Sequence, residues 1–317
     1  MQYRLLGNTG LRVSILGLGS ASLGGVYGDV EETQAISTVH RAFELGVNVF
    51  DSSPYYGQTR GETVLGKGLE GLPRGDYVLM TKCGRDGPDD FDFSARRLHA
   101  SIDESLARLQ TDHVDILSLH DVEFGNLDQI FSESLPALRE IVRSGKARFV
   151  GMTGLPLQIF RRALEARAEF DTVLSYCHAT LFDQLLIDLM PDLQAAGIGV
   201  INASTAAMGL LSSHGPRDWH PAPADIQTAC QQAADLCAQR GVELAELALQ
   251  YSCALPGIAT HLCGTASPGE ITANVEACQQ KPDPELLVAV QQALEPIRNR
   301  SWPQGLPENQ DPPIDPS

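Results

Sequence analysis

Strand-like and helix-like segments alternate along almost the whole chain. Eight apolar runs have the length of a strand buried on both faces, and segments with the spacing of amphipathic helices separate them. We expect the strands at residues 15–18, 47–50, 77–80, 114–119, 147–152, 172–177, 198–203 and 258–264. Eight strand–helix units within 317 residues predict an α/β fold, a (β/α)8 TIM barrel in one domain.

The glycine-rich loop after the first expected strand helps to choose between two folds. A doubly wound open sheet is the alternative, and such sheets bind dinucleotides through a Gly-x-Gly-x-x-Gly turn. Gly17 and Gly19 match the first two glycines of this motif, but neither glycine nor alanine occupies its third position ahead of a helix. Strand count, chain length and the missing fingerprint favour the barrel.

The two ends of the chain add elements to this barrel. Residues 3–6 and 11–14 flank a glycine-containing turn and predict an N-terminal β-hairpin. Residues 285–298 predict an extra C-terminal helix. We assign residues 1–300 to a single barrel domain and residues 301–317, rich in proline and acid, to a partly disordered tail.

Composition and charge limit the classes of partner. The formal net charge is −17, and such a surface repels phosphate backbones, so nucleic-acid binding is not expected. No apolar run reaches membrane-spanning length, and the N-terminus lacks the order of a signal peptide. We therefore expect a cytoplasmic protein without membrane association. Neither the seven cysteines nor the eight histidines show metal-ligand spacing, so we predict no metal.

Polar side chains come at the ends of three successive expected strands. These are Asp51, Lys82 and His120, and Tyr56 follows shortly after the first of them. Each residue alone has a simpler interpretation, as a helix cap or turn residue, a solvated strand end or a buried core histidine. Because the carboxyl ends of parallel barrel strands meet at one mouth, we expect these side chains to converge there as an acid–base site.

This set of residues resembles the catalytic tetrad of the aldo-keto reductase family. Asp51, Tyr56, Lys82 and His120 match it in order and context, and the resemblance covers nearly the whole chain through segments such as residues 51–57, TKCGR and VDILSLHDVEFG. It implies that the hairpin closes the bottom of the barrel. It also implies that the C-terminal segment, here residues 301–306, folds over the mouth and shapes the substrate pocket.

The resemblance also assigns a role to each member of the tetrad. Tyr56 is expected to accept the substrate's hydroxyl proton during oxidation, with Lys82 favouring the phenolate and lowering the phenol pKa. Asp51 is expected to orient Lys82, and His120 to hydrogen-bond the reacting oxygen. Tyr55 is the rival phenol, which we expect to pack against or line the site.

The expected substrate is a small sugar. Residues 175–178 and 208–221 resemble family members that oxidise L-galactose, which implies NAD-dependent oxidation of its hemiacetal C1 to L-galactonolactone. The candidate sugar contacts are Asp121, Glu123, Tyr176, His178 and Trp219. L-Fucose, other threo-configured aldoses, pyridoxal, or a non-catalytic role as a nucleotide-sensing channel subunit are the alternatives. The sequence carries no signal for the oligomeric state.

The cofactor phosphates of such barrels bind after the seventh and eighth strands, at helix N-termini. Ser204 follows the seventh expected strand, and Gly264 and Ser267 follow the eighth. Ser267 is also a natural helix cap, and the resemblance implies that Asn274 contacts adenine. NADP-dependent relatives carry basic residues where this chain has Gly264 and Glu270. A carboxylate repels a 2′-phosphate, so NAD is predicted over NADP.

The nicotinamide contacts depart from the pattern of many relatives. Where those carry Ser-Asn after the fifth strand and Gln in the sixth, this chain has Thr153, Gly154 and Ser175. Where those stack an aromatic ring before the strand-seven serine, it has Ala203. Thr153 and Ser175 remain the candidate contacts to the carboxamide.

Overall fold

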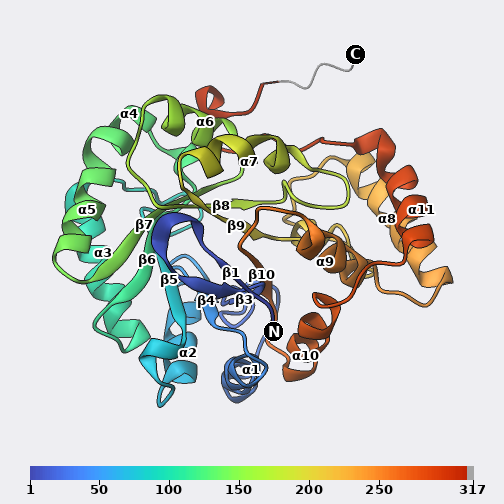
Figure 1. The fold of residues 1–317 in the computed structure, drawn as a ribbon, viewed down its shortest axis with the longest axis horizontal. Helices are drawn as coiled ribbons and strands as arrows, with labels where there is room; N and C mark the ends of the chain where they lie inside the picture. The colour runs from blue at the N-terminus through green and yellow to red at the C-terminus, as the bar shows by residue number, and fades with distance from the viewer. Residues whose placement is uncertain (313–317) are drawn as a thin grey trace.

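A closed barrel of eight parallel strands forms the centre of the computed structural model, which describes residues 1–312 (Figure 1). The strands are β3 (Leu16–Gly19), β4 (Val49–Asp51), β5 (Val78–Cys83), β6 (Val114–Leu119), β7 (Ala147–Gly154), β8 (Thr172–Tyr176), β9 (Gly199–Ala203) and β10 (Thr260–Gly264). The last strand pairs in parallel with the first, His261 opposite Leu16, which closes the ring. The predicted barrel is confirmed, and the open-sheet alternative is wrong.

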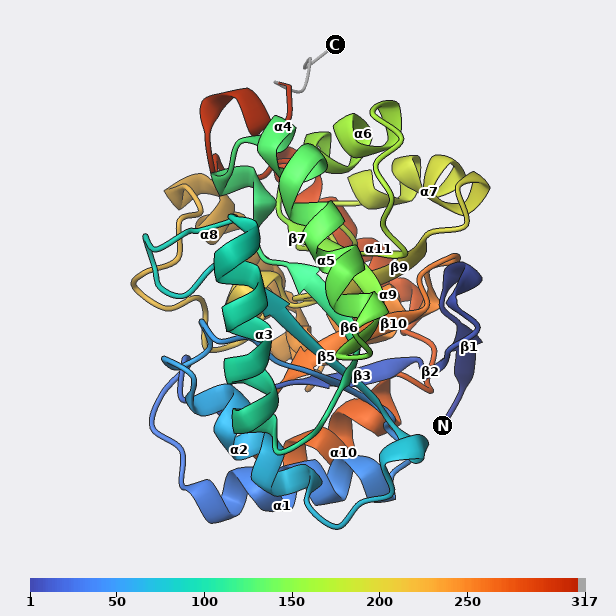
Figure 2. The same ribbon diagram turned by 90° about the vertical axis from the view of Figure 1, so that its left-hand side faces the viewer.

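Helices surround the barrel on its outside (Figures 1 and 2). They are α1 (Glu32–Glu44), α2 (Arg60–Leu69), α3 (Ala95–Leu109), α4 (Leu127–Gln129), α5 (Leu135–Arg143), α6 (Gln158–Glu165), α7 (Leu185–Ala195), α8 (Ala224–Gln239), α9 (Leu244–Ala254), α10 (Pro268–Ala277) and α11 (Pro284–Leu294). Helix α3 shows the local cause: Ser94 caps its first turn, and Leu98, Ile102 and Leu109 bury one stripe. No helix within residues 1–312 is long and apolar enough to cross a membrane.

One expected helix is interrupted. The apolar periodicity predicts a single helix over residues 127–142, but a π-helical turn at Ile130–Ser134 separates α4 from α5. The side chain of Ser134 donates to the carbonyl of Phe93 at 2.6 Å within this turn. Apolar periodicity does not distinguish a π turn from continuous α-helix, because both keep one face buried.

The N-terminal hairpin lies at the bottom of the barrel. Strands β1 (Tyr3–Leu5) and β2 (Arg12–Ser14) pair antiparallel, and Leu6 and Val13 belong to the apolar cluster inside the barrel. Gly7 has φ +51°, and a Cβ there would lie 2.3 Å from the amide nitrogen of Gly199. The turn therefore needs glycine both for its backbone conformation and for its close approach to β9.

The C-terminal tail follows a defined path through residue 312. Trp302 is buried in a second apolar cluster with α8 and α11, 4.8 Å from the His220 ring. The carboxylate of Asp311 accepts hydrogen bonds from the amides of Leu157 and Gln158 at 3.0 and 2.7 Å, so the tail caps α6. The sequence predicted a partly disordered tail; residues 301–312 pack on the barrel, and residues 313–317 lie outside the described part.

Candidate active site

Asp51 and Lys82 form a buried ion pair at the carboxyl ends of two adjacent strands. The Lys82 ammonium lies 2.6 Å from Asp51 Oδ2 and 2.8 Å from the carbonyl oxygen of Ser52. Asp51 and Lys82 are 2% and 1% exposed. Strands β4 and β5 are parallel neighbours, with Asp51 paired to Met80, so Lys82 lies two residues farther along β5 and on the same face of the strand as Met80. The long Lys82 side chain spans this offset and reaches Asp51.

Tyr56 lies against this pair. The Lys82 nitrogen is 4.7 Å from the Tyr56 ring centroid, and the His120 ring meets the same ring edge-on at 5.6 Å. The loop carrying Tyr56 is held by close backbone contact, since a Cβ at Gly57 would lie 2.1 Å from the carbonyl oxygen of Gly24. Tyr56 and the three residues predicted at strand ends are therefore brought together.

The pKa of Tyr56 lies well above its ordinary value of 10, which corrects the expectation from the sequence. Burial is the main cause, and the carboxylates of Asp51 and Asp121 add to it, whereas Arg85 acts in the opposite direction. Lys82 was expected to lower this pKa. It does not dominate because its charge is balanced by Asp51 in direct contact, which leaves desolvation as the larger effect.

His120 is buried and neutral. Burial and the positive charges of Lys82 and Arg85 hold its pKa well below the ordinary value. Its Nδ1 lies 2.8 Å from the hydroxyl of Ser53, and its Nε2 lies 3.8 Å from a carboxylate oxygen of Asp121. Ser53 was not among the predicted site residues, because its place in a turn between strand and helix gave no sign of this contact.

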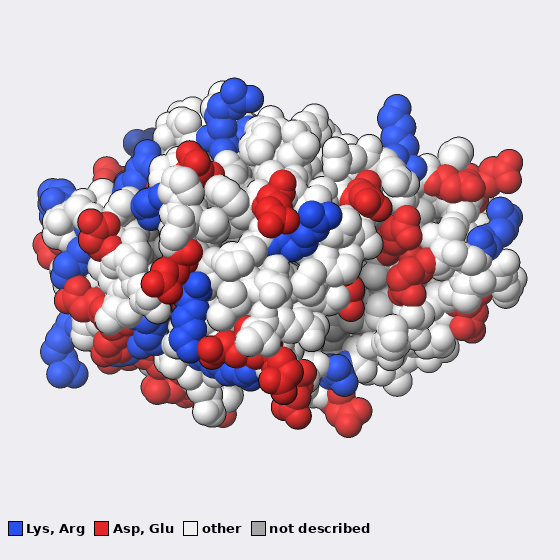
Figure 3. Space-filling view, turned by 90° about the horizontal axis from the view of Figure 1, so that it is seen from below, with Lys and Arg blue, Asp and Glu red and all other residues white. Residues whose placement is uncertain are grey.

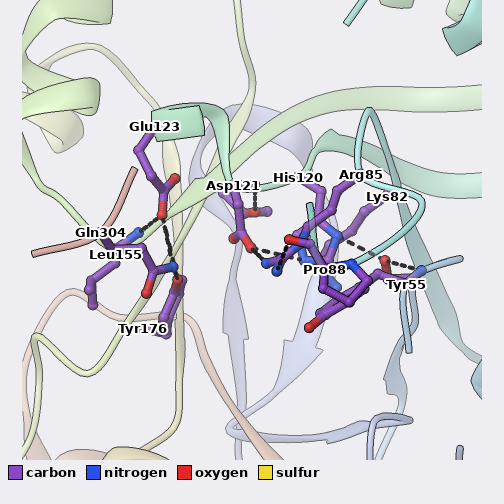
Figure 4. Close-up of polar contacts among 12 residues, drawn as sticks. Tyr55, Lys82, Arg85, Pro88, His120, Asp121, Glu123, Leu155, Tyr176 and Gln304 are labelled. Carbon is purple, nitrogen blue, oxygen red and sulfur yellow. Dashed lines mark hydrogen bonds and ion pairs between the residues drawn. The ribbon is translucent and has the colours of Figure 1, made fainter. Parts of the chain in front are cut away.

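Arg85 is a second functional residue that sequence reasoning missed. Its guanidinium lies 3.9 Å from the Tyr55 ring centroid and is bonded to the carboxylate of Asp121 (Figure 4). The Asp121 amide also donates to Thr153 Oγ1 at 3.0 Å. Burial raises the pKa of Asp121, while Arg85 lowers it. The available signal was a single basic residue just beyond a strand end, in TKCGR.

A second cluster of polar side chains, Glu123, Tyr176 and Gln304, joins the C-terminal tail to the barrel mouth (Figure 4). Glu123 Oε1 accepts from the Leu155 amide at 3.0 Å, from Gln304 Nε2 at 3.3 Å and from the Tyr176 hydroxyl at 3.5 Å. Glu123 is fully buried, and burial raises its pKa well above the ordinary value. Gln304 also bonds to the Tyr176 hydroxyl. Tyr176 and Gln304, which are partly exposed, are the members that can meet a ligand.

The tail is fastened to the same loop by its backbone contacts. The Leu306 amide and Asn309 Nδ2 both donate to the carbonyl of Glu123, at 2.8 and 2.9 Å. A Cβ at Gly305 would lie 2.5 Å from that carbonyl oxygen. This segment therefore forms one wall of the mouth, and Gln304 was missed because nothing in a proline-rich tail indicates where it docks.

The two remaining candidate sugar contacts differ in exposure. His178 is 1% exposed and pairs through Nδ1 with Asp183 at 2.9 Å, so it is part of a buried pair. Trp219 is 51% exposed, and its ring centroid lies 5.9 Å from that of Tyr27 in the loop after β3. Only Trp219 of these two is accessible in this conformation.

The loop between β10 and α10 has the features of a site for a dinucleotide. Ser267 caps α10 by accepting from the Glu270 amide at 3.3 Å, which leaves its hydroxyl proton free for a phosphate. Gly264 is exposed, and Asn274 is partly exposed. The Glu270 carboxylate accepts from the Thr265 hydroxyl at 2.5 Å, which fixes a negative charge at the first turn. The Ser267 hydroxyl is a donor that suits a phosphate, and the Glu270 carboxylate is an acceptor that suits a hydroxyl.

The other predicted cofactor residues lie at the ends of three strands. Ser204 follows β9 in a left-handed conformation, φ +57°. Thr153 is buried at the end of β7. Ser175 lies between Leu174, which belongs to the cluster inside the barrel, and Tyr176. Because side chains alternate along a strand, Ser175 points to the outer face, away from the mouth. Within residues 1–312 no group of three or more His, Cys, Asp or Glu side chains could hold a metal ion.

Surface charge is mixed on the face shown in Figure 3. Basic side chains are scattered between acidic ones, and acidic side chains dominate one end of that face. The basic residues on this side form no continuous stripe of the kind that follows a nucleic-acid backbone.

Three comparisons agree with this geometry. The model of the aldo/keto reductase family matches residues 15–295. The chain is 49% identical to L-galactose dehydrogenase of Arabidopsis thaliana, over 98% of this chain and 99% of that one, and 34% identical to D-arabinose 1-dehydrogenase of Saccharomyces cerevisiae, over 76% and 75%. A solved aldo-keto reductase from Bacillus halodurans superposes with a TM-score of 0.79 at 27% identity, covering 98% of this chain and all of that one.

Proposed function

Because the chain belongs to the aldo/keto reductase family, we propose that it is an NAD-dependent dehydrogenase that oxidises L-galactose at its hemiacetal C1 to L-galactonolactone. The observation that carries the proposal is the buried Lys82–Asp51 pair packed against Tyr56 and His120 at the barrel mouth. The choice of sugar is supported by the 49% identity to the Arabidopsis enzyme over nearly both whole chains.

The tetrad divides the chemistry of this oxidation. Bound NAD supplies the hydride acceptor. Tyr56 accepts the proton from the C1 hydroxyl, and His120 donates a hydrogen bond to the same oxygen. Lys82 provides a fixed positive charge beneath the Tyr56 ring, and Asp51 holds Lys82 in place at 2.6 Å. Buried side chains locked by such contacts keep the reacting groups aligned without rearrangement during the reaction.

The walls of the mouth offer polar groups for the sugar hydroxyls. Asp121, held by Arg85, lies within 3.8 Å of His120 Nε2 and is therefore close to the reacting oxygen. Tyr176 and Gln304 bond to buried Glu123 and to each other rather than to a member of the tetrad. We assign the sugar hydroxyls nearest C1 to Asp121 and the more distant ones to Tyr176 and Gln304.

The cofactor is NAD, held by the β10–α10 loop, the N-terminus of α10 and the residues after β9. Ser267 and the first amides of α10 suit a phosphate, and Asn274 suits the adenine edge. Glu270 sits in the first turn of α10, where its charge opposes a 2′-phosphate and can accept from a 2′-hydroxyl.

Glu270→Arg should narrow the preference for NAD over NADP. Replacing the carboxylate by a guanidinium is expected to raise kcat/KM with NADP relative to NAD by about tenfold or more, since one charge-assisted contact contributes about 1.5–3 kcal/mol. The measurement is the ratio of kcat/KM with the two cofactors at a saturating sugar concentration. Glu276→Arg, an exposed change on the same helix, is the matched control and should leave the ratio unchanged. If NADP stays as poor a cofactor in Glu270→Arg, Glu270 is not the selecting residue.

The substrate assignment is tested by ranking sugars. NADH formation is measured with L-galactose, L-fucose, D-arabinose, D-galactose and pyridoxal under one set of conditions. L-Galactose should give the highest kcat/KM. A higher kcat/KM with another aldose or with pyridoxal would contradict the assignment of L-galactose but leave the proposed hydride-transfer reaction standing. No turnover with any of them would favour a non-catalytic, nucleotide-sensing role.

A further inference from the structure

The buried hydroxyl of Ser53 contacts the imidazole of His120. Ser53 is fully buried and lies in the turn after β4, two residues from the end of that strand. Its Oγ accepts a hydrogen bond from the Tyr55 amide at 3.2 Å and lies 2.8 Å from His120 Nδ1. Within residues 1–312 this hydroxyl makes no further hydrogen bond.

Counting protons fixes the direction of the bond. A serine hydroxyl has one proton to donate, and a buried donor without an acceptor costs about 1–3 kcal/mol. The Tyr55 amide can only donate, so the Ser53 proton must go to His120 Nδ1. Nδ1 is then an acceptor, and a neutral imidazole with an acceptor at Nδ1 carries its proton on Nε2.

The other groups around the imidazole favour the same arrangement. Asp121 Oδ2 lies 3.8 Å from Nε2, and a carboxylate there favours a proton on that nitrogen. Lys82 and Arg85 are positive, and they and the burial of the ring hold the His120 pKa well below its ordinary value, so the ring is neutral. The rings of Tyr55 and Tyr56 contact it at 6.0 and 5.6 Å between centroids.

We propose that Ser53 is a positioning residue that locks His120 in the Nε2–H form, so that His120 acts as a hydrogen-bond donor to the reacting oxygen. A serine, unlike a carboxylate, adds no charge that would stabilise an imidazolium. His120 then neither releases nor takes up a proton in the reaction, and proton transfer is left to Tyr56. This deepens the proposed function and rests on it only for the identity of the reacting oxygen.

The direct test is the tautomer of His120, which needs no substrate. Protein with ¹⁵N-labelled histidine is examined at neutral pH by two-bond ¹H–¹⁵N correlation, and His120 is assigned by its loss in His120→Asn. We expect a protonated Nε2 and an unprotonated, hydrogen-bonded Nδ1. A proton on Nδ1, or a doubly protonated ring, overturns the proposal. Failure of every sugar to turn over leaves this measurement intact and refutes only the proposed function.

Ser53→Ala is the matched variant. We expect the Nδ1 and Nε2 resonances of His120 to move toward each other as the second tautomer becomes populated. We also expect kcat for the sugar to fall by about ten- to a hundredfold with KM for NAD unchanged, as for loss of an oriented donor. Ser101→Ala removes an equally buried serine hydroxyl on α3 and should change neither quantity. An unchanged tautomer in Ser53→Ala contradicts the proposal whatever the rate.

Discussion

Burial raises the pKa of Tyr56, and the balanced Lys82–Asp51 pair beside it does not offset that effect. The Lys82 ammonium touches the Asp51 carboxylate, so the pair presents little net charge to the phenol, and burial raises the Tyr56 pKa well above 10. Removing one member of such a buried pair would leave an uncompensated charge, so we expect the two residues to depend on each other. The phenol is therefore protonated at neutral pH in the free enzyme.

The raised Tyr56 pKa predicts that the rate of oxidation increases with pH into the alkaline range. The reaction needs the phenolate, and below the pKa the phenolate fraction rises tenfold for each pH unit. Because kcat/KM reports the free enzyme, kcat/KM for the sugar should rise through neutral pH without levelling below about pH 10. Initial rates from pH 6 to 10 provide the measurement. A plateau reached near pH 7 or 8 would show that Lys82 lowers the phenol pKa after all.

Single residues were predictable where strand geometry alone places them. Asp51, Lys82 and His120 end adjacent strands, so their convergence follows from the barrel. Ser53 and Arg85 were not, because their contacts depend on how two loops fold against each other. Ser175 was predicted to contact the carboxamide only from its position in the family pattern. Side chains alternate along β8, so the strand that puts Leu174 inside the barrel points Ser175 outward.

Among the elements, the C-terminal tail links the pocket wall to the outer helices. Trp302 anchors it beside α8 and α11, Gln304 reaches the Glu123 loop, and Asp311 caps α6. Its role at the mouth was predicted from family resemblance, but composition suggested partial disorder. Composition does not reveal which part is ordered, because a proline-rich segment with few apolar groups can be held by hydrogen bonds to an existing barrel.

Deleting residues 301–317 should therefore affect sugar binding. We expect KM for the sugar to rise by about fivefold or more, since losing one hydrogen bond costs about 1 kcal/mol, with KM for NAD much less changed. Steady-state kinetics for both substrates provide the measurement. A chain ending at residue 312 keeps every described tail contact and should behave like the full chain. An unchanged KM for sugar in the longer deletion would show that the tail does not contribute to sugar binding.

At the scale of the whole molecule, the hairpin residues that fill the bottom of the core and the residues of the tetrad lie at opposite ends of the barrel. The hairpin fills the bottom with Leu6 and Val13, and the tetrad lies at the carboxyl ends of the strands, at the opposite mouth. The strand order was predictable because eight alternating units admit few topologies. The tight seat of the Gly7 turn on β9 was not, since it depends on a contact between segments almost two hundred residues apart in sequence.

Gly7→Ala should lower the free energy of unfolding without changing the kinetics. The new Cβ would lie 2.3 Å from the Gly199 nitrogen, and overpacking of this kind costs about 1–3 kcal/mol in addition to about 1 kcal/mol for the left-handed backbone. Gly10→Ala is the control, with φ +73° and nothing within 4 Å, and should show only the backbone cost. Chemical denaturation measures both. Equal losses in the two variants would mean that the Gly7 contact is relieved by a small shift.

The most direct test of the account is the effect of removing one phenol at a time. NADH formation from L-galactose is measured for the unmodified chain, Tyr56→Phe and Tyr55→Phe, which each lose one hydroxyl and keep the ring. We predict a loss of at least about a hundredfold in kcat for Tyr56→Phe, the contribution expected of a proton-transfer group, and at most a few-fold loss for Tyr55→Phe. Activity above a tenth in Tyr56→Phe, or the larger loss in Tyr55→Phe, would contradict the assignment of Tyr56 as the base.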